Sequence, residues 1–256
     1  MTDSFAAARM QTALVAAFSA VYEGLAGARV ESRPGYILLV CPPVPLLQFN
    51  GVWAERDGGD AVADLGAALA EVERLGLPFW LQTREGRHPL VEHEARRLGL
   101  ALAEQFPGMV AAASDLTSQP ASGISIERAA DASRLASAAQ VAEAGFAAPP
   151  GTLAALYSER LAATQSISYH LGYAGDDPVS TAMSLVRADT VGIFNVATLP
   201  RCRGRGYGTA LSAHAVQEGL ERGARLAWLQ ASPLGEPVYR RMGFRPVETY
   251  NLFTRG

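Results

Sequence analysis

The stretch VGIFNVATLPRCRGRGYGT, residues 191–209, predicts a β-strand, a glycine-rich turn and the start of a helix. Apolar residues alternate between Val191 and Thr198, which is typical of a strand. Pro200 has no N–H to donate to a neighbouring strand, so the strand should end near it. Three glycines then stand at alternate positions, namely Gly204, Gly206 and Gly208. They let the backbone turn sharply and allow several N–H groups to converge at the N-terminus of the following helix.

Converging N–H groups at a helix N-terminus attract a phosphate group. Two nucleotide-binding motifs do not fit the loop. The dinucleotide motif G-x-G-x-x-G needs a glycine where this chain has Thr209, and the P-loop needs a lysine that the loop lacks. The glycines alone leave two alternatives open, a nucleotide site of another kind and a plain strand-to-helix turn without a ligand.

The composition indicates a soluble globular protein. The chain has 256 residues, of which 49% are hydrophobic and 18% charged, enough for one large domain or two ordinary ones. The formal net charge of −3 argues against nucleic acid as the main partner. Cys41 and Cys202 make neither a ligand cluster nor a disulfide framework, so we expect reduced thiols in a cytoplasmic protein.

We expect neither a metal nor a membrane partner. The histidines show no metal-ligand spacing along the sequence; they are His88, His93, His170 and His214. Apolar residues recur at helical spacing between Phe5 and Leu25, with no basic leader and no apolar run long enough to cross a bilayer. The N-terminal segment is therefore predicted to be an amphipathic packing helix.

The predicted elements form two groups separated by a linker. Strands are expected in the first group at 36–40, 48–53, 77–82 and 109–113 and in the second at 124–127, 167–173, 179–186, 191–198, 225–230 and 247–253, with helices between them. Residues 114–123 are rich in Ser, Thr, Pro and Gly. We therefore predict two domains, 1–118 and 124–256. Short turns between the strands of the second group favour antiparallel neighbours, so the fold class is α/β, or α+β by some schemes.

The two groups echo each other at three places. Phe49-Asn50 matches Phe194-Asn195, and the sequence Trp-Leu-Gln occurs at 80–82 and at 228–230. The third pair is Arg97-Leu98-Gly99-Leu100 with Arg241-Met242-Gly243-Phe244. The three offsets are nearly equal, which predicts two structurally similar halves.

The halves should differ in chemistry. The first half carries Arg56-Asp57-Gly58-Gly59-Asp60 where the second has its glycine loop. The carboxylates of Asp57 and Asp60 would repel a pyrophosphate. We therefore expect one anion site, in the second half, and a structural or pocket-shaping role for the first.

Several motifs together resemble the GNAT superfamily of N-acetyltransferases. They are Arg203-x-x-Gly206-x-Gly208 after its strand, Trp228-Leu229-Gln230, and Tyr239-x-x-x-Gly243-Phe244. The resemblance covers about 124–253 and implies an intact GNAT domain there, preceded by a degenerate GNAT-like half. Each lobe would then be a mixed, largely antiparallel twisted sheet flanked by helices.

The resemblance implies that the second half binds acetyl-coenzyme A as co-substrate. Backbone groups of Val196 and Thr198 would pair with pantetheine, and a strand N–H would meet the acetyl oxygen. The expected cofactor-binding residues are Val196, Ala197, Thr198, Arg203, Gly204, Arg205, Gly206, Tyr207, Gly208 and Thr209. The implied activity is transfer of acetyl to a primary amine of a small molecule or peptide.

Tyr239 is the expected general acid, because a phenol stays protonated at neutral pH and can neutralise a leaving thiolate. The base is left open among Glu143, Asn195 (directly or through water), His170 and Glu236; Glu143 and Asn195 are the preferred pair. The alternative function is an acyl-CoA-binding sensor or regulatory protein without turnover. A homodimer is among the expected assemblies.

Overall fold

The computed structural model describes residues 2–117 and 122–255, which divide into two compact units. Unit 1 consists of Met1–Gly24 and Met109–Val247, and unit 2 of Leu25–Gly108 and Glu248–Gly256. Two strands, β5 (Ala101–Ala112) and β11 (Arg245–Thr254), pass from one unit to the other.

This division differs from the predicted domains 1–118 and 124–256. The N-terminal helix α1 (Asp3–Glu23) joins unit 1 because it contacts the strands β8 and β9 of that unit. The C-terminal end of β11 joins unit 2 because residues 250–253 pair antiparallel with 84–81 of β4 (Trp80–Arg84). Both contacts join segments that lie far apart in the sequence, which local patterns do not reveal. The predicted linker at 114–123 includes residues 118–121, which lie outside the described residues.

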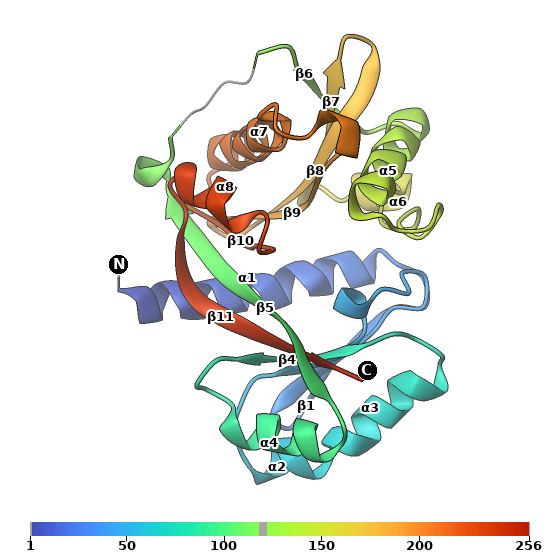
Figure 1. Cartoon of the computed structure of the whole chain (residues 1–256), viewed down its shortest axis with the longest axis vertical. Helices are drawn as coiled ribbons and strands as arrows, with labels where there is room; N and C mark the ends of the chain where they lie inside the picture. The colour runs from blue at the N-terminus through green and yellow to red at the C-terminus, as the bar shows by residue number, and fades with distance from the viewer. Residues whose placement is uncertain (1, 118–121, 256) are drawn as a thin grey trace. The chain divides into compact units, whose positions relative to one another are not determined.

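Unit 1 is a mixed sheet with helices on both faces (Figure 1). Its strands lie in the order β5-β10-β9-β8-β7-β6. They are β6 (Ser125–Arg128), β7 (Ile167–Ala174), β8 (Asp177–Arg187), β9 (Thr190–Thr198) and β10 (Leu226–Gln230), with the end of β5. The helices are α5 (Ala132–Phe146), α6 (Glu159–Ala162), α7 (Tyr207–Glu221) and α8 (Glu236–Arg241), besides α1. In Figure 1, α5 and α6 cover one face of β7–β9, and α7 covers the other.

Strands β6 to β9 pair antiparallel, as the short turns predicted, whereas β9 and β10 pair parallel. A parallel pair needs a crossover, and α7 provides it. Its apolar residues meet the strands in a core that includes Val191, Ile193, Ala215, Val216 and Leu229. Gly219 lets this helix lie close, since a Cβ there would come within 2.6 Å of Val191.

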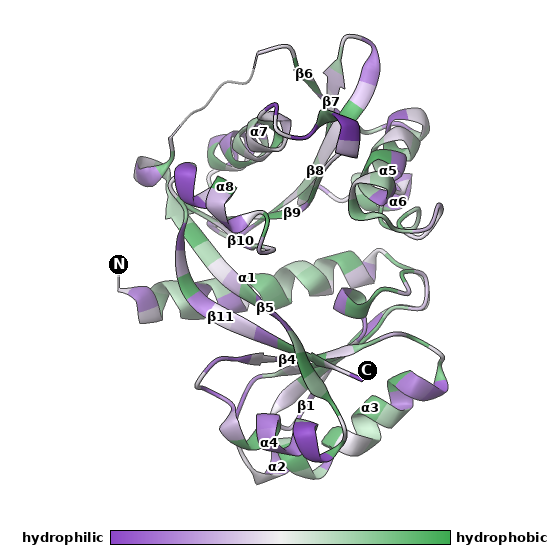
Figure 2. Ribbon diagram, in the orientation of Figure 1, coloured by the Kyte–Doolittle hydropathy of each residue, from purple (hydrophilic) through white to green (hydrophobic). Residues whose placement is uncertain are grey.

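Helix α1 is a core helix of unit 1. Met10 and Leu14 are fully buried, and the ring of Phe18 lies 6.3 Å from that of Phe194 on β9. Much of α1 is apolar (Figure 2), and it is long and apolar enough to meet a length-and-composition criterion for a membrane span. The same criterion is met by buried helices of soluble proteins, and the packed face of α1 accounts for its composition.

Unit 2 is a sheet in the order β1-β2-β3-β4-β11, covered by short helices. Its elements are β1 (Arg29–Arg33), β2 (Tyr36–Val40), β3 (Gly51–Ala54), α2 (Gly59–Ala63), α3 (Leu65–Arg74), β4 and α4 (Pro89–Arg97). Strand β2 is buried throughout. An arginine–glutamate network lies at the β1 edge, where Arg33 binds Glu31 and Glu71 at 2.8 Å each, and Arg29 binds the same two carboxylates.

Three strands have the same order and relative direction in both units. In unit 2, β2 and β3 pair antiparallel and β3 and β4 parallel, as β8, β9 and β10 do in unit 1. Gly51 lies opposite Trp80, and Gly192 opposite Trp228. A Cβ on Gly51 would come within 1.9 Å of the Trp80 carbonyl oxygen, and one on Gly192 within 2.5 Å of the Trp228 ring. Each glycine is therefore required by the close approach of its neighbouring strand.

Of the other two sequence matches between the halves, one marks structurally equivalent positions and the other does not. Gly99 and Gly243 both end a helix in the left-handed region, with φ of 81° and 98°. The match of Phe49-Asn50 with Phe194-Asn195 is wrong in register. Asn50 precedes β3, and its side chain accepts from the Cys41 N–H at 2.7 Å, whereas Asn195 lies inside β9.

Candidate active site

The site predicted from the glycine loop lies where β9 and β10 part. Their parallel pairing extends only from Thr190–Leu226 to Gly192–Trp228, although β9 continues to Thr198 and β10 to Gln230. A bulge lies just beyond this point. Asn195 has a φ of 49°, and the register with β8 shifts between Thr181 and Met183. Asn tolerates the left-handed region better than most residues, so the extra residue bends β9 at little cost.

Beyond the bulge, β9 has one edge without a neighbouring strand. The Leu199 N–H donates to the Val179 carbonyl at 2.9 Å, on the β8 side. Residues of a strand direct their backbone groups alternately to its two edges, so Val196 and Thr198 direct theirs toward the edge that β10 has left. Ala197 directs its carbonyl to β8, where it accepts from the Ser180 hydroxyl at 2.8 Å.

The glycine loop joins this strand to α7. Gly204 and Gly206 have φ values of 76° and 80°, a region that other residues adopt only with strain. Gly206 is the N-cap of α7, which has no side-chain cap and no acidic residue in its first turn. The first backbone bond runs from the Ala210 N–H to the Gly206 carbonyl at 3.0 Å. The N–H groups of the preceding residues are thus available to an anion, and the helix dipole favours one there.

Arg203 has a defined role in this loop. Its guanidinium donates to the carbonyls of Gly145 at 2.6 Å and of Thr198 at 3.3 Å. It therefore ties the end of α5 to the end of β9. Arg205 is exposed as well and immediately precedes the N-cap Gly206 of α7.

Tyr239 lies on α8, the helix that follows β10. It is partly buried against the core beneath α7, and its ring packs edge-on against Phe244 at 5.8 Å. Burial raises the pKa of the phenol, and the neighbouring Ser212 hydroxyl of α7 lowers the same pKa by less. Tyr239 is therefore protonated throughout the neutral range.

Glu143 and Asn195 surround a residue that the sequence patterns did not single out as functional, Tyr157. The Tyr157 side chain is buried, and its loss of solvation raises the pKa of the hydroxyl. The Asn195 side chain lowers this pKa, and the Glu143 carboxylate raises it. Glu143 is itself buried, and one of its oxygens accepts from the Leu153 N–H at 2.9 Å. Both preferred base candidates therefore lie near one buried phenol.

The other two base candidates lie elsewhere. Successive residues of β7 face opposite sides of the sheet: Tyr169 donates to the Leu156 carbonyl, and the His170 ring lies 5.2 Å from that of His214 on α7. His170 thus faces away from Tyr157. Glu236 pairs with Arg240 at 2.6 Å along α8.

A family model described as an acetyltransferase (GNAT) domain matches residues 128–247. We refer to residues 128–247 as the GNAT domain, after the family model that they match. The match includes β9, the glycine loop, α7, β10 and α8, and this family assignment supports acyl transfer as the chemistry of the domain.

Solved structures share the fold over most of the chain. A GCN5-related N-acetyltransferase from Kribbella flavida is 21% identical with a TM-score of 0.67, and the match covers 93% of each chain. One from Sphaerobacter thermophilus is 18% identical, TM-score 0.58, over 86% of this chain and 79% of that one. A tandem GNAT protein from the clavulanic acid biosynthesis pathway is 11% identical, TM-score 0.58, over 86% and 77%. No curated protein matched the chain. The mixed, mostly antiparallel twisted sheet flanked by helices is thereby confirmed as a GNAT fold.

The loop of unit 2 that corresponds to the glycine loop of the GNAT domain has a different use. Asp57 accepts from the N–H groups of Leu90 at 2.9 Å and Val91 at 3.1 Å, so its carboxylate caps the N-terminus of α4. Asp60 lies in the first turn of α2. The loop carboxylate of unit 2 therefore caps α4, the helix that follows β4, and not the helix that follows the loop itself.

Two groups of side chains in the GNAT domain were missed from the sequence. Ser212 is buried beside Tyr239, four residues after Gly208 on the helix that the motif begins. His170, His214 and Glu218 also come together, although the histidines lie on separate elements. The spacing of His214 and Glu218, one helical turn apart, was the available signal for that cluster.

Proposed function

We propose that the GNAT domain transfers the acetyl group of acetyl-CoA to a primary amine by direct attack. The observation that carries this proposal is the parting of β9 from β10 beside an uncapped helix N-terminus, with Tyr239 on the helix that follows β10. The free edge of β9 suits an extended pantetheine arm, and the N-terminus of α7 suits its pyrophosphate.

Each residue is assigned one task. Backbone N–H groups of residues 204–209 bind the pyrophosphate, assisted by the charge of Arg205, while Arg203 holds the loop against β9 and α5. The edge groups of Val196 and Thr198 bind pantetheine, and the Val196 N–H donates to the acetyl oxygen as it becomes an oxyanion. Ala197 and Tyr207, both buried, support the strand and the helix.

The reaction needs two proton transfers. The amine nitrogen forms a bond to the acetyl carbon, the carbon–sulfur bond breaks, and Tyr239 gives its proton to the leaving thiolate. The attacking nitrogen loses a proton to Glu143 or, through Asn195 and water, to solvent. His170 and Glu236 are not assigned this task, because His170 faces α7 and Glu236 is paired with Arg240.

The remaining parts of the proposal concern the context of the enzyme. Unit 2 is a degenerate tandem copy with a structural role, because its loop carries the carboxylates of Asp57 and Asp60, and that of Asp57 already caps α4. The protein works in the cytoplasm on a small-molecule or peptide amine, as a monomer or homodimer, without nucleic acid, membrane or metal in the reaction. A sensor that binds acyl-CoA without turnover is the competing function.

Thiol release from acetyl-CoA across a panel of polyamines, amino acids, aminoglycosides and peptides tests the proposal. Tyr239→Phe should lower kcat about 100-fold or more, as for loss of a general acid, and leave acetyl-CoA affinity unchanged. On the alkaline side, the wild-type kcat should fall only above pH 10, because burial raises the Tyr239 pKa above its ordinary 10.0. Tight acetyl-CoA binding without thiol release for any amine would favour the sensor.

A further inference from the structure

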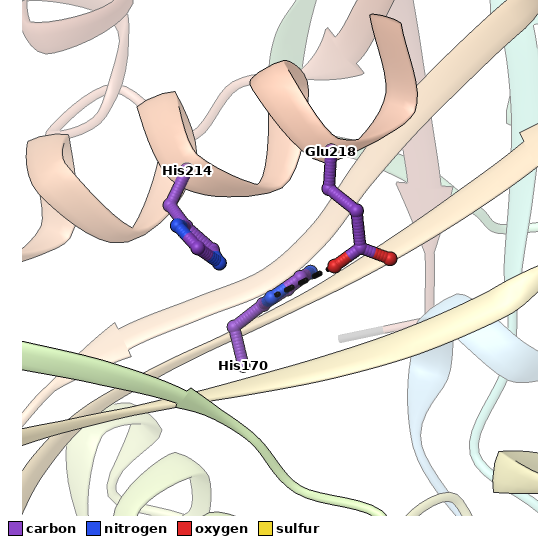
Figure 3. A group of neighbouring side chains, drawn as sticks. All are labelled: His170, His214 and Glu218. Atoms are coloured by element: carbon purple, nitrogen blue, oxygen red, sulfur yellow. Dashed lines mark ion pairs between the residues drawn. The ribbon is translucent and has the colours of Figure 1, made fainter. Parts of the chain in front are cut away.

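The cluster of His170, His214 and Glu218 lies between strand β7 and helix α7 (Figure 3). His214 and Glu218 extend from one face of the helix toward His170 on the strand. Their ligand atoms all lie within 4.8 Å of one another, and His170 Nδ1 is 3.7 Å from Glu218 Oε2. None of the three is used in the proposed acetyl transfer.

The surroundings of the His170 side chain point to a ligand. This side chain is fully buried, and its Nδ1 has no hydrogen-bond partner among residues 2–117 and 122–255. Its Nε2 lies 3.1 Å from the Ser184 hydroxyl. When Nε2–H donates to Ser184, the Nδ1 lone pair faces a carboxylate oxygen, and 3.7 Å is too long for a hydrogen bond between them. Two electron-pair donors directed at one point are satisfied by a cation.

We propose that His170, His214 and Glu218 form a binding site for a transition-metal ion of the zinc class. Two imidazoles and one carboxylate, with a fourth position for water, are a donor set that suits Zn²⁺. Mg²⁺ and Ca²⁺ prefer several oxygen ligands, and here only Glu218 supplies one.

The surroundings already orient two of the ligands. Ser184 holds the His170 ring, and Ser168 donates to Glu218 Oε1 at 2.7 Å, which leaves Oε2 directed at His170. Such outer contacts are what metal-ligating histidines and carboxylates have in known sites.

Two features limit the affinity for Zn²⁺. Donor atoms of a tetrahedral zinc site lie about 3.4 Å apart, so the widest separation must close by up to about 1.4 Å. His214 is exposed and can make this movement. Arg222 lies 3.5 Å from Glu218 Oε1, and Arg128 faces the same cluster from β6, so both repel a cation. We therefore expect a removable ion that ties α7 to β7, rather than one required for folding.

Calorimetric titration of the untagged, EDTA-treated full chain with Zn²⁺ alone tests the site. One ion should bind per chain, and saturating Zn²⁺ should raise Tm by about 5 °C or more at a hundredfold excess over Kd. His214→Ala removes an exposed ligand without opening the core and should weaken binding at least about tenfold. Glu218→Gln keeps an acceptor for Ser168 and should also weaken it.

His93→Ala is the matched control, because His93 is an exposed helical histidine of unit 2. It should bind Zn²⁺ like the wild type. Co²⁺ should give the intense visible absorption of a tetrahedral complex in the wild type and the His93 variant but not in the His214 variant. Absence of stoichiometric binding in the wild type, or equal affinity of the His214 and His93 variants, would overturn the proposal.

Discussion

A carboxylate placed in the first turn of α7 should stabilise the helix and at the same time weaken binding of the cofactor. Thr209 is the third residue of this helix, whose first turn has no acidic residue and no side-chain cap. Thr209→Glu complements the helix dipole, which is worth about 0.3–1 kcal/mol. Tm should therefore rise by about 1–4 °C for a chain of this size.

The same charge repels a pyrophosphate bound at the N-terminus. Two like charges 4 Å apart repel by about 4 kcal/mol near a protein surface and by about 1 kcal/mol in bulk water. A value between these limits corresponds to a loss of acetyl-CoA affinity of about 100-fold. Thr209 is a cleaner position than Arg203, because replacing Arg203 also removes the contacts between its guanidinium and two carbonyls.

Calorimetry with acetyl-CoA and thermal unfolding should be run on Thr209→Glu and on its neutral match, Thr209→Gln. The glutamate variant should bind acetyl-CoA more weakly than the glutamine variant, and this difference in affinity should shrink as salt is raised from about 0.1 M to about 1 M. Over that range the electrostatic screening length falls from about 10 Å to about 3 Å. Equal affinities of the two variants, with the expected rise in Tm, would show that the pyrophosphate binds elsewhere.

Three further experiments test other parts of the structure. Asp57→Ala removes the cap of α4 and should lower the free energy of unfolding by about 1 kcal/mol in chemical denaturation, with acetyl-CoA affinity unchanged. A loss of acetyl-CoA affinity in this variant would show that the loop belongs to the cofactor site. Gly219→Ala forces a methyl group against Val191 and should destabilise the folded chain by about 1–3 kcal/mol. Gly66→Ala in α3, where the new methyl group makes only ordinary contacts, should stabilise it by about 0.5–1 kcal/mol. Effects of the same sign in the two variants would contradict the packing described. The arginine–glutamate network holds the pKa values of the Glu31 and Glu71 carboxyls below 4.5. Its stabilisation is therefore present above that pH and is lost as pH falls through the lowered pKa values. Arg33→Gln should make Tm less sensitive to pH in that acidic range, and an unchanged dependence of Tm on pH would contradict this role of the network.

The local pattern was sufficient where a structural element depends on neighbouring residues. The strand at 191–198, the glycine turn and the helix after it were predicted because alternation, a proline stop and glycines with positive φ all act within a few residues. The family resemblance rested on the same short motifs, and the GNAT domain at 128–247 confirmed it.

Long-range contacts explain what the pattern missed. The sequence could not assign α1 to unit 1 or the end of β11 to unit 2, because those partners are far away along the chain. The match of Phe49-Asn50 with Phe194-Asn195 was wrong in register because a match of two residues does not determine register. The register is determined by the pairing of Gly51 with Trp80 and of Gly192 with Trp228.

The sequence by itself determined the resemblance to the GNAT family, the glycine loop at 203–209 and Tyr239 as the candidate acid, since these depend on local motifs. Only the tertiary structure decided what surrounds them: a β9 edge that no described strand pairs with, an Arg203 bound to carbonyls, and a buried His170 facing His214 and Glu218 of α7. The physical reason is that hydrogen-bond partners and burial depend on which distant elements pack together, and side-chain chemistry follows from both.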